Sequence, residues 1–131
     1  MGADHRALQE KPRLKVSVVV PAFNEERLLP AALAAIREAA KVFEDAGGWE
    51  LIVCDNNSSD RTAQFARAAG AQVVFEPHNQ ISRARNRGAA AARGEWLLFV
   101  DADSVPSPGL LHGMKAAIDS GRCLAGGSTI A

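Results

Sequence analysis

The sequence predicts an α/β fold, a mostly parallel sheet with helices on both faces. Short apolar, β-branched runs alternate along the chain with longer segments whose apolar residues recur every three or four positions. Strands that alternate with helices pair in parallel through right-handed crossovers. Two of the runs, VSVVV and WLLFV, are apolar throughout, which is typical of strands covered on both faces.

The first strand is expected over residues 15–20, where β-branched residues lead up to Pro21. A helix over residues 28–46 follows, and Gly47 and Gly48 end it. Its apolar stripe has spacings of three and four residues: Leu29, Leu33, Ile36, Ala40 and Phe43. The rest of the chain continues the alternation, with strands over residues 49–54, 72–75, 96–100 and 123–129, and helices over residues 62–69, 82–92 and from Ser107-Pro108 to Gly121.

The composition bounds the class of protein. With 131 residues, of which 47% are hydrophobic, the chain can build one domain with a real core, expected over residues 14–131 behind a flexible tail at residues 1–13. Fifteen Lys and Arg balance fifteen Asp and Glu, which argues against a dedicated nucleic-acid-binding protein. The sequence shows no transmembrane segment and no secretory signal, and Cys54 and Cys123 are expected to be free thiols, so the expected location is cytoplasmic.

Polar side chains gather just after the first, second and fourth predicted strands. In an open α/β sheet the ligand crevice lies at the carboxyl ends of the strands, so these three loops are expected to meet at one edge. Helix capping would explain any one loop, but the combination indicates a ligand site. The residues concerned are Asn24, Glu25 and Glu26, then residues 55–60, then Asp101, Asp103 and Ser104.

The sharpest of these features is the Asp-x-Asp of LLFVDADS, formed by Asp101 and Asp103. Two carboxylates at the end of an apolar strand are costly unless a cation lies beside them. Mg²⁺ or Mn²⁺ prefers hard oxygen ligands and often takes one or two protein carboxylates together with ligand phosphates. The motif therefore predicts a divalent-metal site.

Two further features suit a nucleotide. Asp55 follows the run LIVC, where its carboxylate could accept an N–H from a base edge or cap a turn of its own. In the helix ISRARNRG, Arg83 and Arg87 share one face and Arg85 points elsewhere. Arginine suits a diphosphate. For Arg87 a solvent-exposed position on the helix surface is favoured. For Arg83 and Arg85 both interpretations, solvent exposure and diphosphate binding, stay open.

Four motifs in order, VSVVVPAFNEE, DNNSSDRT, ARNRG and FVDADS, resemble the family-2 glycosyltransferases with the GT-A fold, and they span residues 16–104. Members of that family commonly show PxxNE after the first strand, an S-x-D-x-T turn after the second, an Ala-Arg-Asn-x-Gly helix and a DxD. Their second motif usually reads DDGSSDGT. Here Asn56 and Asn57 replace the second Asp and the Gly, and Asp55 is retained.

The resemblance implies a nucleotide-sugar donor, most often a UDP- or GDP-sugar, and metal-dependent transfer with inversion to an acceptor (sugar, lipid or protein) that the sequence does not identify. Asp55 would contact the base, and Asp101 and Asp103 would hold Mg²⁺ or Mn²⁺ at the diphosphate. The other residues implied at the donor site are Pro21, Ala22, Asn24 and Glu25 around the nucleoside, with Arg83, Arg85, Asn86 and Ala102 toward the nucleotide and phosphates.

The resemblance also implies a catalytic base well downstream of the DxD. Asp119 is the single acid after Asp103, and a surface role is expected for it. The chain is therefore expected to be the donor-binding half, with the acceptor half absent and little turnover. An incomplete sheet would also expose an edge that favours homo-oligomers.

Two alternatives are kept. FVDADSV also resembles haloacid-dehalogenase phosphatases, in which Asp101 would be the nucleophile, and a non-catalytic nucleotide-binding module fits the short chain. An NAD enzyme is disfavoured because PAFNEE lacks the glycines of GxGxxG.

Overall fold

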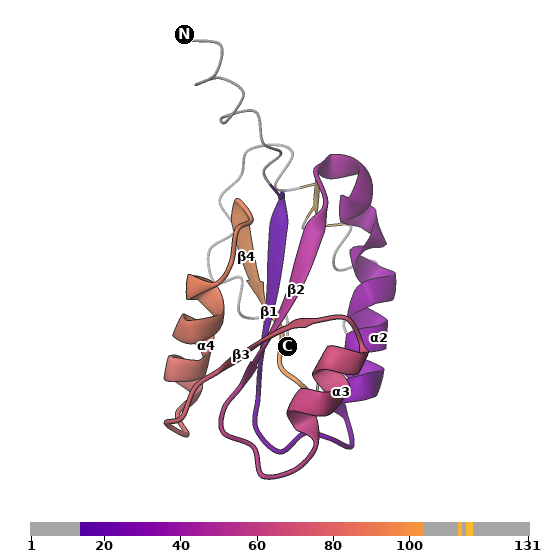
Figure 1. The fold of residues 1–131 in the computed structure, drawn as a ribbon. Helices are drawn as coiled ribbons and strands as arrows, with labels where there is room; N and C mark the ends of the chain where they lie inside the picture. Colours follow the sequence, from indigo (N-terminus) through magenta and orange to yellow (C-terminus); the bar gives the residue numbers. More distant parts are fainter. Residues whose placement is uncertain (1–13, 104–112, 114, 117–131) are drawn as a thin grey trace, which may run out of the picture.

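The computed structural model describes residues 14–103, 113, 115 and 116. The elements in order are β1 (Val16–Ala22), α2 (Leu29–Ala39), the 3₁₀ helix η1 (Ala40–Ala46), β2 (Trp49–Asp55), α3 (Thr62–Ala68), β3 (Gln72–Phe75), α4 (Ile81–Ala90) and β4 (Trp96–Phe99). The four strands form one sheet in the order β3-β2-β1-β4, and every pair is parallel (Figure 1). The predicted parallel α/β fold is confirmed. The predicted tail at residues 1–13, the last strand, and all of the helix after Ser107 except residues 113, 115 and 116, which are helical, lie outside the described residues.

Helices cover both faces of the sheet, as the continuous apolar strands predict. On one face, Val18 and Val20 pack with Leu33 of α2, Phe43 of η1 and other buried apolar residues in the main core. On the other face α4 contacts β1 and β2, and Val19 lies beneath it. Figure 1 shows α4 on one side of the sheet and α2 with α3 on the other.

β1 runs further than the sequence indicates, because it includes Pro21 and pairs with β2 as far as Ala22. The carbonyl of Val19 accepts a hydrogen bond from Val100 and so faces β4. Pro21, two residues on, faces the same side, where the pairing with β4 has already ended at Val19. Its missing N–H therefore costs no ladder hydrogen bond.

The helix predicted over residues 28–46 is two elements. α2 ends at Ala39 and the chain continues as η1 to Ala46, where the C-cap residue Gly47 has a left-handed φ of 112°. A 3₁₀ helix has three residues per turn, so Ala40 and Phe43 lie one above the other, and both are buried. The apolar stripe read from the sequence is thus correct although the helix type changes along it.

Two of the remaining expectations can be checked on the described residues. None of the helices described is long and apolar enough to cross a membrane. Cys54 is a buried free thiol, and burial raises its pKa to about 11. Cys123 lies outside the described residues.

Candidate functional site

The loops after β1, β2 and β4 meet at the carboxyl edge of the sheet, at the bottom of Figure 1. β1 and β2 end together, with Ala22 paired to Asp55, and the N–H of Asn56 donates to the carbonyl of Ala22 at 2.8 Å. The N–H of Val100, which leads into the DxD, donates to the carbonyl of Val19 at 3.0 Å. The predicted convergence of the three loops follows from this parallel register.

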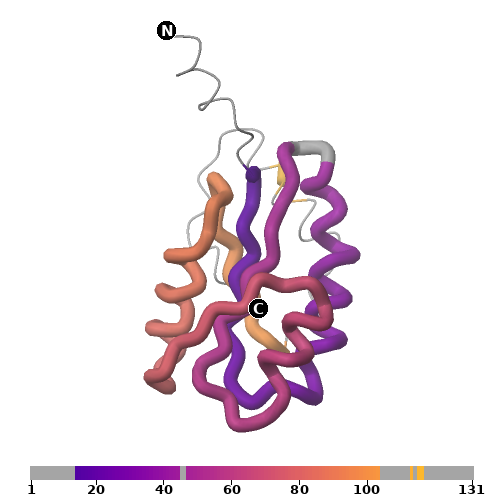
Figure 2. The backbone as a smooth tube through the Cα atoms, in the orientation of Figure 1, coloured from indigo at the N-terminus to yellow at the C-terminus, as the bar shows by residue number. Residues whose placement is uncertain are grey.

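The loops after β1 and β2 are joined by hydrogen bonds between backbone and side chains, and they run side by side in Figure 2. The N–H of Asn24 donates to Oγ of Ser58 at 2.9 Å, and Oδ1 of Asn24 accepts the N–H of Ser59 at 2.8 Å. The N–H of Glu25 donates to Oγ1 of Thr62 at 2.9 Å. Asn24 has a positive φ of 51°, a conformation that asparagine tolerates better than most residues.

Asp60 connects the same two loops. Oδ2 accepts the N–H of Glu26 at 3.2 Å, and Oδ1 accepts both the N–H of Thr62 at 2.9 Å and its hydroxyl. Desolvation would raise the pKa of Asp60, but these hydrogen bonds outweigh it and hold the pKa below its usual range. Arg61 occupies the N-cap position of α3 and makes no side-chain cap hydrogen bond, but Asp60, one residue earlier, accepts the N–H of Thr62 and so caps the first turn of the helix.

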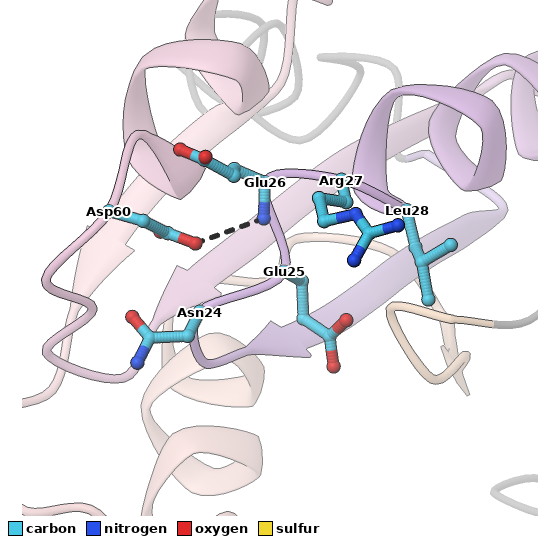
Figure 3. A pocket seen from close by; sticks show the side chains of 6 residues that line it. All are labelled: Asn24, Glu25, Glu26, Arg27, Leu28 and Asp60. Atoms are coloured by element: carbon cyan, nitrogen blue, oxygen red, sulfur yellow. Dashed lines mark hydrogen bonds between the residues drawn. The ribbon is translucent and has the colours of Figure 1, made fainter.

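A cavity of about 430 Å³ opens beside this junction, lined by Asn24, Glu25, Glu26, Arg27, Leu28 and Asp60 (Figure 3). Figure 3 shows Asp60 joined to the N–H of Glu26 while Glu25 projects away from that bond. Desolvation raises the pKa of Glu25, and the negative charges of Asp103 and Asp60 raise it further. The DxD and the loop after β1 therefore face a common region.

The DxD carboxylates suit a divalent cation. Asp103 is exposed, Asp101 is half-buried, and Nη2 of Arg85 lies 3.9 Å from Oδ1 of Asp101. Among the described residues no group of three or more His, Cys, Asp or Glu forms a complete metal cage. Mg²⁺ and Mn²⁺ do not require one, because they keep waters and bind substrate phosphates.

The structure separates the three polar residues of α4 that were assigned to the nucleotide. Arg85 lies beside Asp101 and over the ring of Phe99, at 5.9 Å from its centroid. Arg83 and Asn86 instead line a second cavity of about 320 Å³, together with Glu76, Arg87 and Ala90. The predicted division of the arginines between two helix faces is therefore correct.

Asp55 is buried at the end of β2, with 7% of its surface exposed. Its Oδ1 accepts the N–H of Ser58 at 3.0 Å, so the local turn foreseen from the sequence is present. The N–H of Glu76 donates to the carbonyl of Asp55 at 3.0 Å. Glu76 was not singled out from the sequence. A single acid in the short loop EPHNQ carries no motif, and its neighbours become apparent only in three dimensions.

The described part of the chain has the fold of GT-A glycosyltransferases. It superimposes on Staphylococcus aureus TarS with a TM-score of 0.71 and 29% identity, over 82% of this chain and 33% of that one. It also matches glucosyl-3-phosphoglycerate synthase from Mycobacterium tuberculosis, solved with Mn²⁺ and UDP, with a TM-score of 0.66 and 29% identity over 81% of this chain and 39% of that one.

The chain belongs to glycosyltransferase family 2, because the model of "Glycosyl transferase family 2" matches residues 17–131. An uncharacterised glycosyltransferase of M. tuberculosis is 40% identical over 112 residues, which are 86% of this chain and 47% of that protein. A dolichyl-phosphate β-glucosyltransferase of Trichomonas vaginalis is 34% identical, over 75% of this chain and 33% of its own length. The chain thus spans less than half the length of these relatives. Membership of this family favours the transferase over the phosphatase alternative.

Proposed function

We propose that this chain forms the donor-binding part of a glycosyltransferase that takes its sugar from a UDP-sugar. The observation that carries the proposal is the meeting of Glu25, Asp55 and the Asp101–Asp103 pair at one edge of the sheet. Ligands of open α/β sheets bind at that edge. TarS has been crystallised with UDP-GlcNAc and glucosyl-3-phosphoglycerate synthase with UDP, which favours uridine over guanosine.

The residues take the following parts in the proposal. Asp55, at the end of β2, accepts an N–H of the uracil ring, while Ser58 fixes the orientation of its carboxylate. The end of β1, from Pro21 to Glu25, lies along the nucleoside. Arg85, next to Asp101, supplies positive charge toward the diphosphate.

The DxD is assigned to a divalent cation. Asp103 and Asp101 would hold Mg²⁺ or Mn²⁺, and the metal, when bound, neutralises the charge of the departing nucleoside diphosphate. The structure of glucosyl-3-phosphoglycerate synthase with Mn²⁺ supports a divalent ion of this kind. The family resemblance implies inversion at the anomeric carbon and a base further along the chain than the DxD.

A thermal-shift screen of the purified chain with UDP, GDP, CDP and ADP, each with and without Mn²⁺, tests the proposal. A ligand that binds the native state raises the apparent melting temperature by mass action. We expect UDP with Mn²⁺ to give the largest increase. A melting temperature that none of the four nucleotides changes, with or without Mn²⁺, would contradict the proposal.

The screen is paired with an assay of donor hydrolysis and glycosyl transfer using UDP-glucose and UDP-GlcNAc. Binding of UDP together with little or no turnover is expected of a chain that spans 47% of its relative. Rapid turnover by this chain alone would show that the remaining catalytic groups lie within it.

A further inference from the structure

Asn56, at the end of β2, is a buried polar residue, 5% exposed, that bonds to two other segments, the end of β1 and the loop after β3. Its backbone N–H donates to the carbonyl of Ala22 at 2.8 Å. Its side-chain Nδ2 donates to the backbone oxygens of Glu76 at 3.1 Å and His78 at 2.5 Å. Its own carbonyl accepts a hydrogen bond from Nδ2 of Asn79. The loop after β3 is thus tied to the loop after β2.

The chemistry of this position requires an amide. Two backbone carbonyl oxygens face the side chain of Asn56, and a carbonyl oxygen only accepts hydrogen bonds, so the side chain must donate. The aspartate usual here in the second family motif offers acceptors alone when ionised. The next residue follows the same pattern: Asn57 replaces the usual glycine, keeps a positive φ of 63°, and donates from Nδ2 to the carbonyl of Pro77 at 3.2 Å. The departures at positions 56 and 57 therefore both add donors toward one loop.

The loop that Asn56 holds is itself attached to α4. The buried carboxylate of Glu76 accepts the N–H of His78 at 3.0 Å and lies 3.4 Å from Nη2 of Arg87 on α4. The N–H of Gln80, the N-cap residue of α4, donates to the carbonyl of His78 at 2.7 Å. A continuous set of contacts therefore runs from the end of β2 to the start of α4.

We propose that Asn56 is a positioning residue whose side-chain amide holds Asp55 and the start of α4 in the arrangement that receives the base of the nucleotide. The inference rests on the proposed function. The same tied loop bonds directly to the backbone of Asp55 through the N–H of Glu76. The DxD carboxylates, in contrast, follow β4, which lies on the other side of β1 from β2. The hydrogen bonds of Asn56 go to Ala22, Glu76, His78 and Asn79 and do not include Asp101 or Asp103, so Asn56 acts on the base end of the site and not on the DxD.

The test compares two ligands on the whole chain by titration calorimetry with Mn²⁺ present, UDP and inorganic pyrophosphate. Asn56→Asp removes the donors without changing the size of the side chain. We expect its affinity for UDP to fall roughly tenfold or more, the effect of an unsatisfied buried group, and its affinity for pyrophosphate to stay within about twofold. Gln64→Glu, the same amide-to-carboxylate change at an exposed position of α3, should alter neither affinity.

Unchanged UDP affinity in Asn56→Asp, or an equal loss for both ligands, would overturn the proposal. A second variant covers the case in which Asn56→Asp does not fold. Asn79→Ala removes the hydrogen bond that the exposed Asn79 side chain donates to the carbonyl of Asn56. A loss of UDP affinity of about threefold with unchanged pyrophosphate affinity supports the proposal, and unchanged UDP affinity contradicts it. Failure of the unmodified chain to bind UDP would instead count against the proposed function.

Discussion

Gly88 of α4 lies so close to Val19 of β1 that no side chain fits between them. A Cβ added at Gly88 would overlap Cγ1 of Val19 and would lie 3.8 Å from Cβ of Cys54. This contact brings α4, and with it Arg85, down onto the sheet. The close packing explains why the Ala-Arg-Asn-x-Gly motif of this helix has a glycine at its last position.

We expect Gly88→Ala to lower the free energy of unfolding by about 1–3 kcal/mol, because overpacking a close contact forces the backbone apart. Urea denaturation followed by circular dichroism measures the change. Gly113→Ala is the matched control, since a Cβ there meets no described residue within 4 Å. Equal stability of the two variants would show that α4 can move away from the sheet at little cost.

A second prediction concerns the pH dependence of stability through Glu50. Desolvation would raise the pKa of Glu50, but hydrogen bonds from Ser17 at 2.6 Å and from the N–H of Arg93 at 2.6 Å hold it below the ordinary value of 4.5. The folded protein therefore binds fewer protons at this carboxyl than the unfolded chain. Its stabilisation is present above about pH 4.5 and is lost as the pH falls through the lower folded-state value.

We expect Glu50→Gln to cost roughly 1–3 kcal/mol at pH 7, with the difference from the unmodified chain shrinking toward pH 3. Urea denaturation at several pH values measures this difference. Glu44→Gln, at an exposed position of η1, is the control and should show no such trend. A difference for Glu50→Gln that stays constant with pH would rule out the carboxylate as its source.

The junction between the loops after β1 and β2 gives a third prediction. Thr62→Val keeps the shape of the side chain but removes the Oγ1 that accepts the N–H of Glu25. A loss of about 1–2 kcal/mol in the free energy of unfolding is expected from the unpaired N–H. Thr62→Ser, which keeps the hydroxyl, should recover most of it. A Thr62→Val variant as stable as the unmodified chain would show that this hydrogen bond does not stabilise the fold.

The fourth prediction separates the two ends of the proposed donor site. Asp103→Asn should remove most of the increase in UDP affinity that Mn²⁺ produces, since one hard anionic ligand is lost, and should leave metal-free UDP binding within about twofold. Calorimetry with and without Mn²⁺ measures both. The control is again Glu44→Gln. If the UDP affinity of Asp103→Asn depends on Mn²⁺ as strongly as that of the unmodified chain, Asp103 is not a metal ligand.

Local patterns were sufficient for the elements and for the edge that carries the polar loops. The β-branched runs, the apolar stripe of α2 and η1 and the strand-end position of Asp55 all depend on residues within a few positions of one another. The sequence did not predict those features that depend on a residue far away along the chain. Pro21 stays within β1 because β4 has stopped pairing there, and Asp60 accepts the N–H of Glu26 from the other loop in addition to that of Thr62 at the start of α3.

The sequence by itself determined a parallel α/β domain of glycosyltransferase family 2 with its acids at the carboxyl ends of the strands. The periodicity of the apolar residues and the order of the motifs can both be read directly along the chain. Tertiary structure alone decided which of those groups meet. It brought Arg85 next to Asp101, set Glu25 in the field of Asp103, and gave the Asn56 amide two carbonyl oxygens some twenty residues away. Such pairings depend on strand order and loop path, which place residues together whatever their separation along the chain.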